Sequence, residues 1–144
     1  MSDLSVHFSS ASCDWETPPD FFTELNKEFH FTLDACASQY NCKVTNYYSL
    51  EDNGLMREWN GVVWCNPPYG DETVNWCRKA LCSVKLQQAN IIVMLLPART
   101  DNHWFHTYIL PYAEIRFIQG RLKFNNAPTG APFPSMLAIF RHNI

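Results

Sequence analysis

A chain of 144 residues with 47% hydrophobic and 15% aromatic side chains can bury one core and is too short for several domains. No apolar run reaches the length of a membrane span, and the first residues form no apolar signal segment. These features exclude an integral membrane protein, and we expect a soluble protein of the cytoplasm.

The net charge of −3 is the sum of two very different halves. Residues 1–75 carry three basic and twelve acidic side chains, whereas residues 76–144 carry eight basic and two acidic ones. A basic C-terminal half is compatible with a surface that contacts phosphate groups. Ordinary solvated surface explains the same pattern equally well, so charge alone leaves nucleic-acid binding open.

The six cysteines raise the question of disulfides or a metal site. They form no C-x-x-C pair, and several of them lie inside apolar runs. We therefore expect reduced, mostly buried thiols and no bound metal. No arrangement of histidine, cysteine and aspartate resembles a nucleophile triad.

The chain is expected to begin with a flexible arm and a helix. Residues 1–14 are small and polar, which favours a loose arm ahead of a single domain over residues 15–144. The stretch TPPD before FFTELNKEF predicts a helix with Thr17 as its cap and a proline in its first turn.

Strands and helices then alternate along the chain. FHFTLDACA predicts a strand that ends near Asp34, and VTNYYSL allows a short second strand. The later apolar runs predict a strand, a helix, a strand, a short helix capped by Asp101 or Asn102, and three strands: GVVWC, TVNWCRKALCSVKL, NIIVMLLP, DNHWFHTYIL, EIRFIQG, RLKF and SMLAIFRH. This order predicts an α/β fold, a compact three-layer sandwich with a mixed sheet and an antiparallel C-terminal edge.

The loop Asn66-Pro67-Pro68-Tyr69, directly after GVVWC, is the strongest candidate for a functional site. Proline cannot continue a sheet ladder, so the loop is a stiff segment at the carboxyl end of a strand, where open α/β sheets bind ligands. The Asn66 side-chain oxygen and the Pro67 carbonyl can accept both hydrogens of an exocyclic amine while Tyr69 stacks on its ring. A base presented in this way must leave the duplex. A structural turn with a surface tyrosine is the simpler alternative.

The loop resembles the [DNS]-P-P-[YFW] motif of amino-methyltransferases, which transfer the methyl group of S-adenosylmethionine to exocyclic nitrogens. The whole series of motifs is most similar to the phage-type (Dam-like) DNA N6-adenine methyltransferases. Between Trp15 and Phe140 it comprises W-x-T-P-x-x-x-F, F-x-L-D-x-C-A, W-C-N-P-P-Y-G, LLPART, G-R-L-x-F and PFPSMLAIF. The resemblance implies a Rossmann-like, S-adenosylmethionine-dependent fold, double-stranded DNA as substrate, and a phage or prophage gene expressed in a bacterial cytoplasm.

The resemblance also implies roles for individual residues. Catalytic roles fall on the four loop residues Asn66, Pro67, Pro68 and Tyr69. Cofactor binding falls on two earlier segments, at Trp15, Thr17, Pro18, Asp34, Ala35, Cys36 and Ala37. The segment LDACAS has no glycine where the wider methyltransferase pattern is glycine-rich, and its small residues could serve the same steric purpose.

Further candidates follow the predicted strands. Glu51 or Asp52 lies where an acid would hold ribose hydroxyls, although either could be a solvated surface acid. Arg99, Arg121 and Lys123 are candidates for DNA contacts, with a surface salt bridge or a solvated hairpin as the alternative. The segment with His103, Trp104 and His106 is better explained as a packing helix than as a substrate cleft.

The leading hypothesis is therefore a DNA adenine-N6 methyltransferase that uses S-adenosylmethionine and requires no metal. The alternatives are a methyltransferase for an RNA base or a protein glutamine amide, and a catalytically inactive DNA-binding homologue. Cytosine N4 would satisfy the same two acceptors, so the resemblance rather than the chemistry selects adenine. The oligomeric state is left open, with a monomer favoured.

Overall fold

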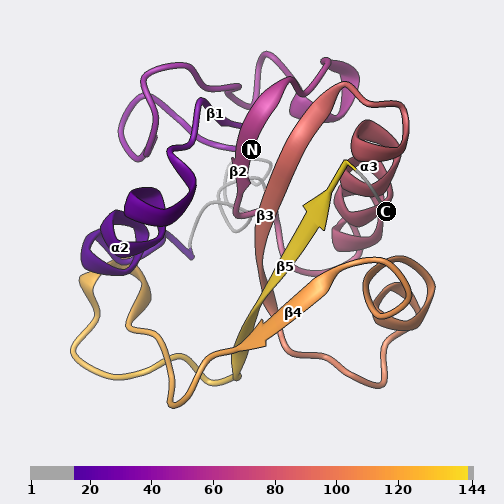
Figure 1. Cartoon of the computed structure of the whole chain (residues 1–144). Helices are drawn as coiled ribbons and strands as arrows, with labels where there is room; N and C mark the ends of the chain where they lie inside the picture. The colour runs from indigo at the N-terminus through magenta and orange to yellow at the C-terminus, as the bar shows by residue number, and fades with distance from the viewer. Residues whose placement is uncertain (1–14, 143–144) are drawn as a thin grey trace, which may run out of the picture.

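The computed structural model describes residues 15–142, so the flexible arm expected over residues 1–14 lies outside the described residues. A mixed five-stranded sheet with strand order β1-β2-β3-β5-β4 forms its centre (Figure 1). The strands are β1 (Leu33–Asp34), β2 (Gly61–Cys65), β3 (Ala89–Pro97), β4 (Glu114–Phe117) and β5 (Ser135–Arg141). The first three run parallel, whereas β5 runs antiparallel to both β3 and β4. The predicted α/β class and the antiparallel C-terminal edge are confirmed.

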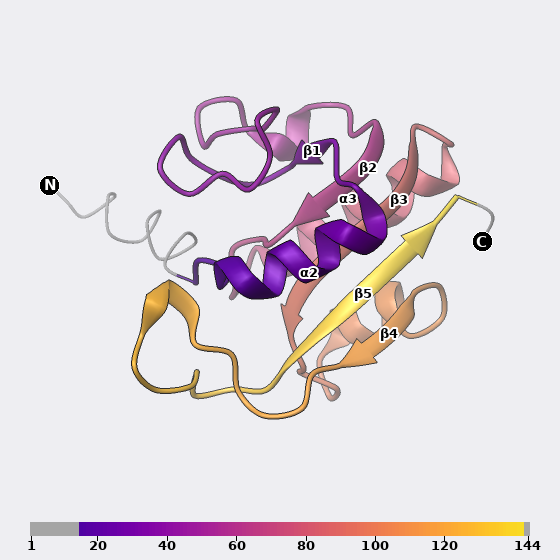
Figure 2. The ribbon, with the colours of Figure 1, turned by 60° about the vertical axis from the view of Figure 1, so that its left-hand side comes forward.

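Helical segments pack against both faces of this sheet (Figure 2). The helix α2 (Pro19–Phe29) covers one face, and α3 (Thr73–Lys85) with the π-helix η2 (Phe105–Ile109) covers the other. Two short 3₁₀ turns, η1 (Gly54–Met56) and η3 (Phe124–Asn126), lie in the loops. No helix within residues 15–142 is long and apolar enough to cross a bilayer.

Residues on the central strand β3 alternate between two apolar cores. Ile92, Met94 and Leu96 pack with α3, whereas Val93 and Leu95 pack with α2. Successive side chains on a strand point to opposite faces, and a strand that is covered on both faces reads as a continuous apolar run. This double burial explains why NIIVMLLP carries the clearest strand signal in the chain.

The helix α2 forms as predicted, but Thr17 is not its cap. Pro19 occupies the first helical turn, where its missing N–H costs nothing, and Phe22, Leu25 and Phe29 form the buried face. Pro18 occupies the capping position, and no side chain caps the helix there. The Thr17 hydroxyl instead accepts a hydrogen bond from the Asn66 side chain, so tertiary contact takes precedence over the local capping pattern.

Three other local expectations are wrong. VTNYYSL contributes a single bridge between Tyr47 and Asp34, and no strand. RLKF is an irregular segment between Gly120 and η3, because the left-handed φ of Gly120 and of η3 residues bends the chain on both sides. The helical segment after β3 begins at His103 and continues as η2, whose capping residue is Trp104 and which has no side-chain cap, so the expected cap at Asp101 or Asn102 is not seen.

The expectation of mostly buried thiols is also only partly met. Cys65 in β2 and Cys77 in α3 are buried, whereas Cys82 is exposed and Cys36 and Cys42 are half-buried in the loop after β1. The described cysteines form no disulfide with one another. Within residues 15–142 no group of histidine, cysteine or acidic residues is arranged to hold a metal ion.

Candidate functional site

The loop Asn66–Tyr69 leaves the carboxyl end of β2 between the ends of β1 and β3. Both prolines are buried, while Asn66 and Tyr69 are half-buried. Thr73, at the start of α3, fastens the far end of the loop. Its hydroxyl donates to the Pro68 carbonyl at 2.9 Å and accepts from the Gly70 N–H at 3.0 Å. The loop is therefore rigid both through its prolines and through this hydroxyl.

The Asn66 side-chain amide is held by both of its ends. Its Nδ2 donates to the Trp15 carbonyl at 2.5 Å and to the Thr17 hydroxyl at 3.1 Å. Its Oδ1 lies 2.8 Å from the Tyr69 hydroxyl, which also lies 3.0 Å from the Leu95 carbonyl. Burial raises the pKa of Tyr69 well above its usual range, so the hydroxyl remains a neutral donor. The amide is thereby fixed in one orientation.

Aromatic rings from the loop before β5 hold the Tyr69 ring in place. Phe133 and Phe124 meet it edge-on, with ring centroids at 5.7 and 6.5 Å. The same two rings also contact Trp15 edge-on, at 4.9 and 5.5 Å. Trp15 and Tyr69 are therefore positioned by one shared aromatic cluster, although they lie 54 positions apart in the sequence.

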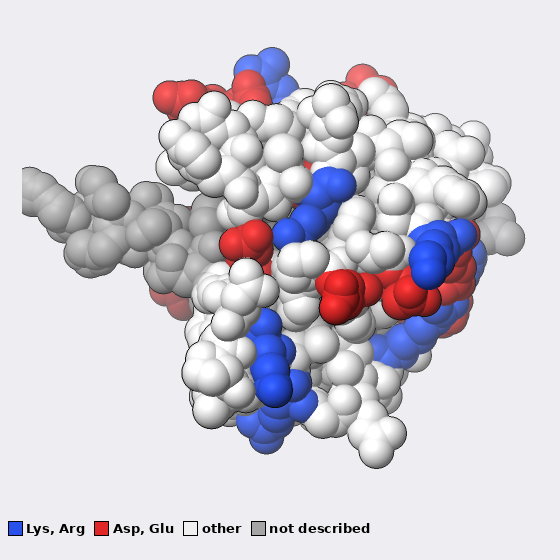
Figure 3. All heavy atoms as spheres, turned by 90° about the vertical axis from the view of Figure 1, so that its left-hand side faces the viewer, with Lys and Arg blue, Asp and Glu red and all other residues white. Residues whose placement is uncertain are grey.

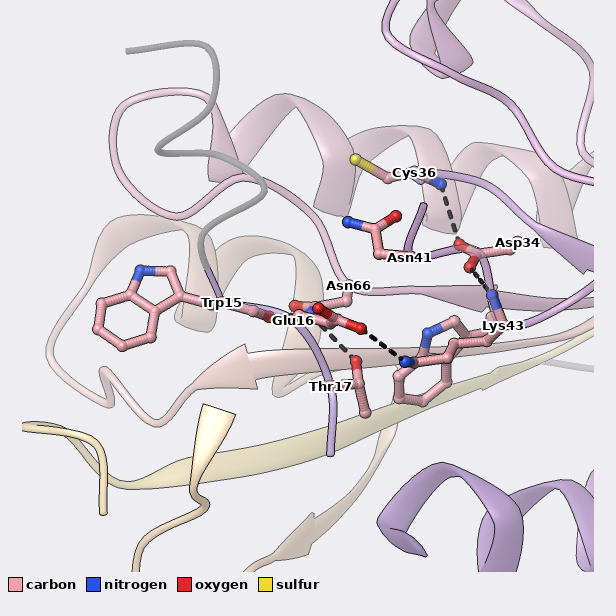
Figure 4. A pocket seen from close by; sticks show the side chains of 9 residues that line it. Trp15, Glu16, Thr17, Asp34, Cys36, Asn41, Lys43 and Asn66 are labelled. Atoms are coloured by element: carbon pink, nitrogen blue, oxygen red, sulfur yellow. Dashed lines mark hydrogen bonds and ion pairs between the residues drawn. The ribbon is translucent and has the colours of Figure 1, made fainter. Parts of the chain in front are cut away.

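A small cavity lies on the side of Asn66 that faces β1 and the segment before α2 (Figure 4). It encloses about 20 Å³. Its lining combines charged, polar and aromatic side chains: Trp15, Glu16, Thr17, Asp34, Cys36, Asn41, Lys43, Trp64 and Asn66. Four of the residues that were predicted to bind a cofactor, namely Trp15, Thr17, Asp34 and Cys36, thus meet the first residue of the proline loop at one place.

Asp34 brings a carboxyl group with unusual properties to this cavity. Its side chain is 2% exposed and accepts hydrogen bonds from the backbone N–H groups of Lys43 at 3.0 Å and Cys36 at 3.3 Å. Burial raises the pKa of Asp34 to about 7, while these two hydrogen bonds oppose the shift. The carboxyl group is therefore divided between neutral and ionised forms near neutral pH, and a cation placed beside it would favour the ionised form.

A second, larger cavity of about 440 Å³ lies at the other end of the loop, between the carboxyl ends of β2 and β3. Its lining comes from the proline loop, the start of α3 and the segment after β3: Tyr69, Gly70, Asp71, Thr73, Val74, Pro97, Arg99, Asn102, His103 and Trp104. Arg99 is exposed here, with its guanidinium 6.0 Å from the centre of the Phe133 ring. The loop therefore joins two cavities, with Asn66 in one and Tyr69 in the other.

Other predicted residues lie outside both linings. Among the expected cofactor residues these are Pro18, Ala35, Ala37, Glu51 and Asp52. Ala35 and Ala37 are buried, whereas Glu51 is exposed. The Asp52 carboxylate accepts hydrogen bonds from the backbone N–H and the hydroxyl of Ser49. These two hydrogen bonds lower the pKa of Asp52 and hold its carboxylate within the turn.

The two basic candidates on the loop before η3 are both exposed. Arg121 donates to the Ala131 carbonyl at 3.1 Å, which ties it across its own loop. Figure 3 shows basic and acidic side chains in separate, alternating groups on the face that it views. On that face the basic side chains therefore do not form one continuous surface.

Sequence patterns missed several residues that line the cavities. Glu16 stands inside the W-x-T-P motif, but the pattern gives it no role. Asn41 and Lys43 reach the small cavity through the irregular loop after β1, so no periodicity could have indicated them. Asn102 and His103 line the large cavity from a segment whose apolar pattern is that of a packing helix.

Comparison with known proteins identifies the family of the chain. The family described as DNA N-6-adenine-methyltransferase (Dam) matches residues 6–142. The DNA N-6-adenine-methyltransferase of Haemophilus phage HP1 is 33% identical over 88% of this chain and 77% of its own length. That of Escherichia phage T1 is 36% identical over 75% of this chain and 45% of its own length. The chain belongs to the DNA N-6-adenine-methyltransferase (Dam) family, a family of adenine-specific DNA methyltransferases.

The raised pKa of Asp34 predicts a pH-dependent stability. The native chain holds a proton at Asp34 that the unfolded chain releases, so stability is greatest below the ordinary aspartate pKa and falls as pH rises toward about 7. We expect the unfolding temperature of the unmodified chain to fall between pH 5 and pH 8 relative to that of Asp34→Asn. Asp20→Asn, an exposed position, is the matched control. Parallel pH profiles for the unmodified chain and Asp34→Asn would contradict the assignment.

Proposed function

We propose that this chain transfers the methyl group of S-adenosylmethionine to N6 of an adenine that has been flipped out of double-stranded DNA. The observation that carries the proposal is the single rigid loop that lines both cavities. Asn66 faces the cavity that contains the predicted cofactor residues, and Tyr69 faces one large enough for a nucleotide base. A loop in this position can bring a donor and an acceptor together.

The charged side chains of the small cavity are complementary to the charged groups of the cofactor. S-adenosylmethionine carries a sulfonium, an ammonium and a carboxylate, and the buried carboxyl group of Asp34 offers a counter-charge for a cation. When bound, the cofactor supplies an electrophilic methyl group. Because the enclosed volume is about 20 Å³, side chains at the mouth must move before it binds.

The proposed cofactor residues fall into two groups. Trp15, Thr17, Asp34 and Cys36 line the cavity, and Pro18, Ala35 and Ala37 shape the backbone around it. Glu51 or Asp52 is proposed to hold the ribose hydroxyls.

The residues of the proline loop position the target amine. We assign the Asn66 Oδ1 and the Pro67 carbonyl as acceptors of the two N6 hydrogens, which directs the nitrogen lone pair toward the methyl group. The Asn66 Oδ1 already accepts the Tyr69 hydroxyl, and its second lone pair is the one offered to the amine. Pro68 keeps the loop stiff. The attacking atom belongs to the base, so no covalent enzyme intermediate is required.

The larger cavity is the proposed place for the flipped adenine, with Tyr69 against its ring. Arg99 stands at its edge as a contact for phosphate or base, and Arg121 and Lys123 are proposed to contact the DNA backbone. The surrounding architecture is proposed to be a Rossmann-like methyltransferase fold, with residues 15–144 as a single domain. Three adjacent parallel strands with the candidate ligands at their carboxyl ends support this assignment.

Substitution of Asn66 tests the reaction directly. We expect Asn66→Ala to lower the transfer of tritiated methyl groups from S-adenosylmethionine to unmethylated DNA by about 100-fold or more, because the amine loses an oriented acceptor. Asn60→Ala, at an exposed position, should retain full activity. The label should be recovered as N6-methyladenine. Label on RNA or protein alone, or equal activity of Asn66→Ala and the unmodified chain, would refute the proposal.

Salt dependence tests the proposed DNA contacts. Each phosphate contact that is lost should lower the slope of log affinity against log salt concentration by about one. We therefore expect Lys123→Ala to reduce this slope, whereas Lys85→Ala, on the helix α3, should leave it unchanged. Fluorescence anisotropy with duplex DNA at several salt concentrations measures both. An unchanged slope for Lys123→Ala would remove that residue from the interface.

A further inference from the structure

An ion pair in the lining of the small cavity joins two segments that are far apart in sequence (Figure 4). The Lys43 ammonium lies 3.3 Å from a carboxylate oxygen of Glu16. Glu16 precedes α2, while Lys43 stands on the loop between β1 and β2. Both residues line the cavity beside Thr17 and Asn66, so the ion pair is part of the candidate cofactor site.

Lys43 is the fixed member of the pair. Its backbone N–H donates to the buried carboxyl group of Asp34 at 3.0 Å, and only 13% of its side chain is exposed. An anion beside the ammonium compensates for the largely buried position of this side chain, and in this structure that anion is Glu16. A ligand that displaces Glu16 must therefore present an anion to Lys43 in its place.

Glu16 is the member of the ion pair whose side chain can move away from its partner. Its backbone is anchored to Asn125 in both directions, since its N–H donates to the Asn125 side chain at 2.7 Å and its carbonyl accepts from the Asn125 N–H at 3.1 Å. Its side chain, however, is 37% exposed. The carboxylate can therefore rotate into water without any movement of the chain around it.

We propose that Lys43 binds the carboxylate of the cofactor's methionine part, and that Glu16 occupies that position until the cofactor displaces it. The inference rests on the proposed function, because it takes S-adenosylmethionine as the ligand. The exchange replaces one carboxylate by another, so the Lys43 ammonium keeps a charge-assisted partner in both states. It also explains how a cavity that encloses about 20 Å³ opens without unfolding.

The two members of the pair should then have opposite effects on affinity. Removing the charge of Lys43 should weaken S-adenosylmethionine binding by about ten- to a hundredfold, as expected for one charged hydrogen bond. Removing the charge of Glu16 should tighten binding, because the competing carboxylate is lost. A purely structural ion pair would weaken binding in both variants.

Titration calorimetry with two ligands tests the proposal. S-adenosylmethionine and its decarboxylated form share the sulfonium, the amine and the adenosine, and differ in the carboxylate alone. The variants are Lys43→Gln, Lys43→Arg and Glu16→Gln. The matched controls are Lys27→Gln and Glu24→Gln, which break an exposed ion pair on α2.

Lys43→Gln is expected to weaken binding of S-adenosylmethionine and to leave that of the decarboxylated ligand nearly unchanged, with Lys43→Arg restoring most of the loss. Glu16→Gln should tighten S-adenosylmethionine binding, and the controls should change neither ligand. An equal loss for both ligands in Lys43→Gln, or weaker binding in Glu16→Gln, would overturn the proposal while leaving the cofactor assignment intact. Failure of the unmodified chain to bind either ligand would overturn the proposed function as well.

Discussion

The fixed orientation of the Asn66 amide is the constraint on which the rest of the candidate site depends. Its Nδ2 is bonded to the Trp15 carbonyl and the Thr17 hydroxyl, and its Oδ1 meets the Tyr69 hydroxyl. If the side-chain amide could rotate by 180°, it would present its NH₂ donor instead of its oxygen acceptor to the target amine. The segment before α2 and the loop after β2 both contribute to this geometry, whereas the Leu95 carbonyl of β3 shares the single hydrogen of the Tyr69 hydroxyl with Asn66.

Electrostatics divides the small cavity into two parts with opposite preferences. Asp34 is buried, and its pKa is raised to about 7. A cation bound beside it would stabilise the ionised carboxylate. Lys43, whose backbone N–H donates to Asp34, has its ammonium paired with the carboxylate of Glu16. Under the proposed function, the ammonium and the carboxylate of the cofactor's methionine part would be the partners of Asp34 and Lys43.

The sequence alone predicted the elements that depend on apolar periodicity or on proline. The strands β2 and β3, the helix α3 and the proline loop were all indicated correctly, because burial and fixed φ angles leave local traces. Thr17 was misassigned as a cap because its partner, Asn66, is distant in the chain. RLKF was misassigned as a strand because left-handed turns on both sides are not visible in its residues.

The parts of the site that could not be predicted are those that depend on irregular loops. Lys43 reaches Glu16 across 27 positions of sequence, and no spacing rule connects them. The larger cavity, likewise, exists because the segment after β3 turns back beside the proline loop. The motif resemblance identified the residues of the loop, but it could not indicate the hydrogen bond between the Tyr69 hydroxyl and the Asn66 side chain.

Replacement of Tyr69 by phenylalanine tests that bond most directly, because it removes the hydroxyl and keeps the aromatic ring. If the hydroxyl orients the Asn66 amide, Tyr69→Phe lowers kcat for methylation of adenine by about tenfold, as expected for one lost hydrogen bond. The KM values for S-adenosylmethionine and DNA should change little. An unchanged kcat would contradict the central role of the Asn66 amide orientation.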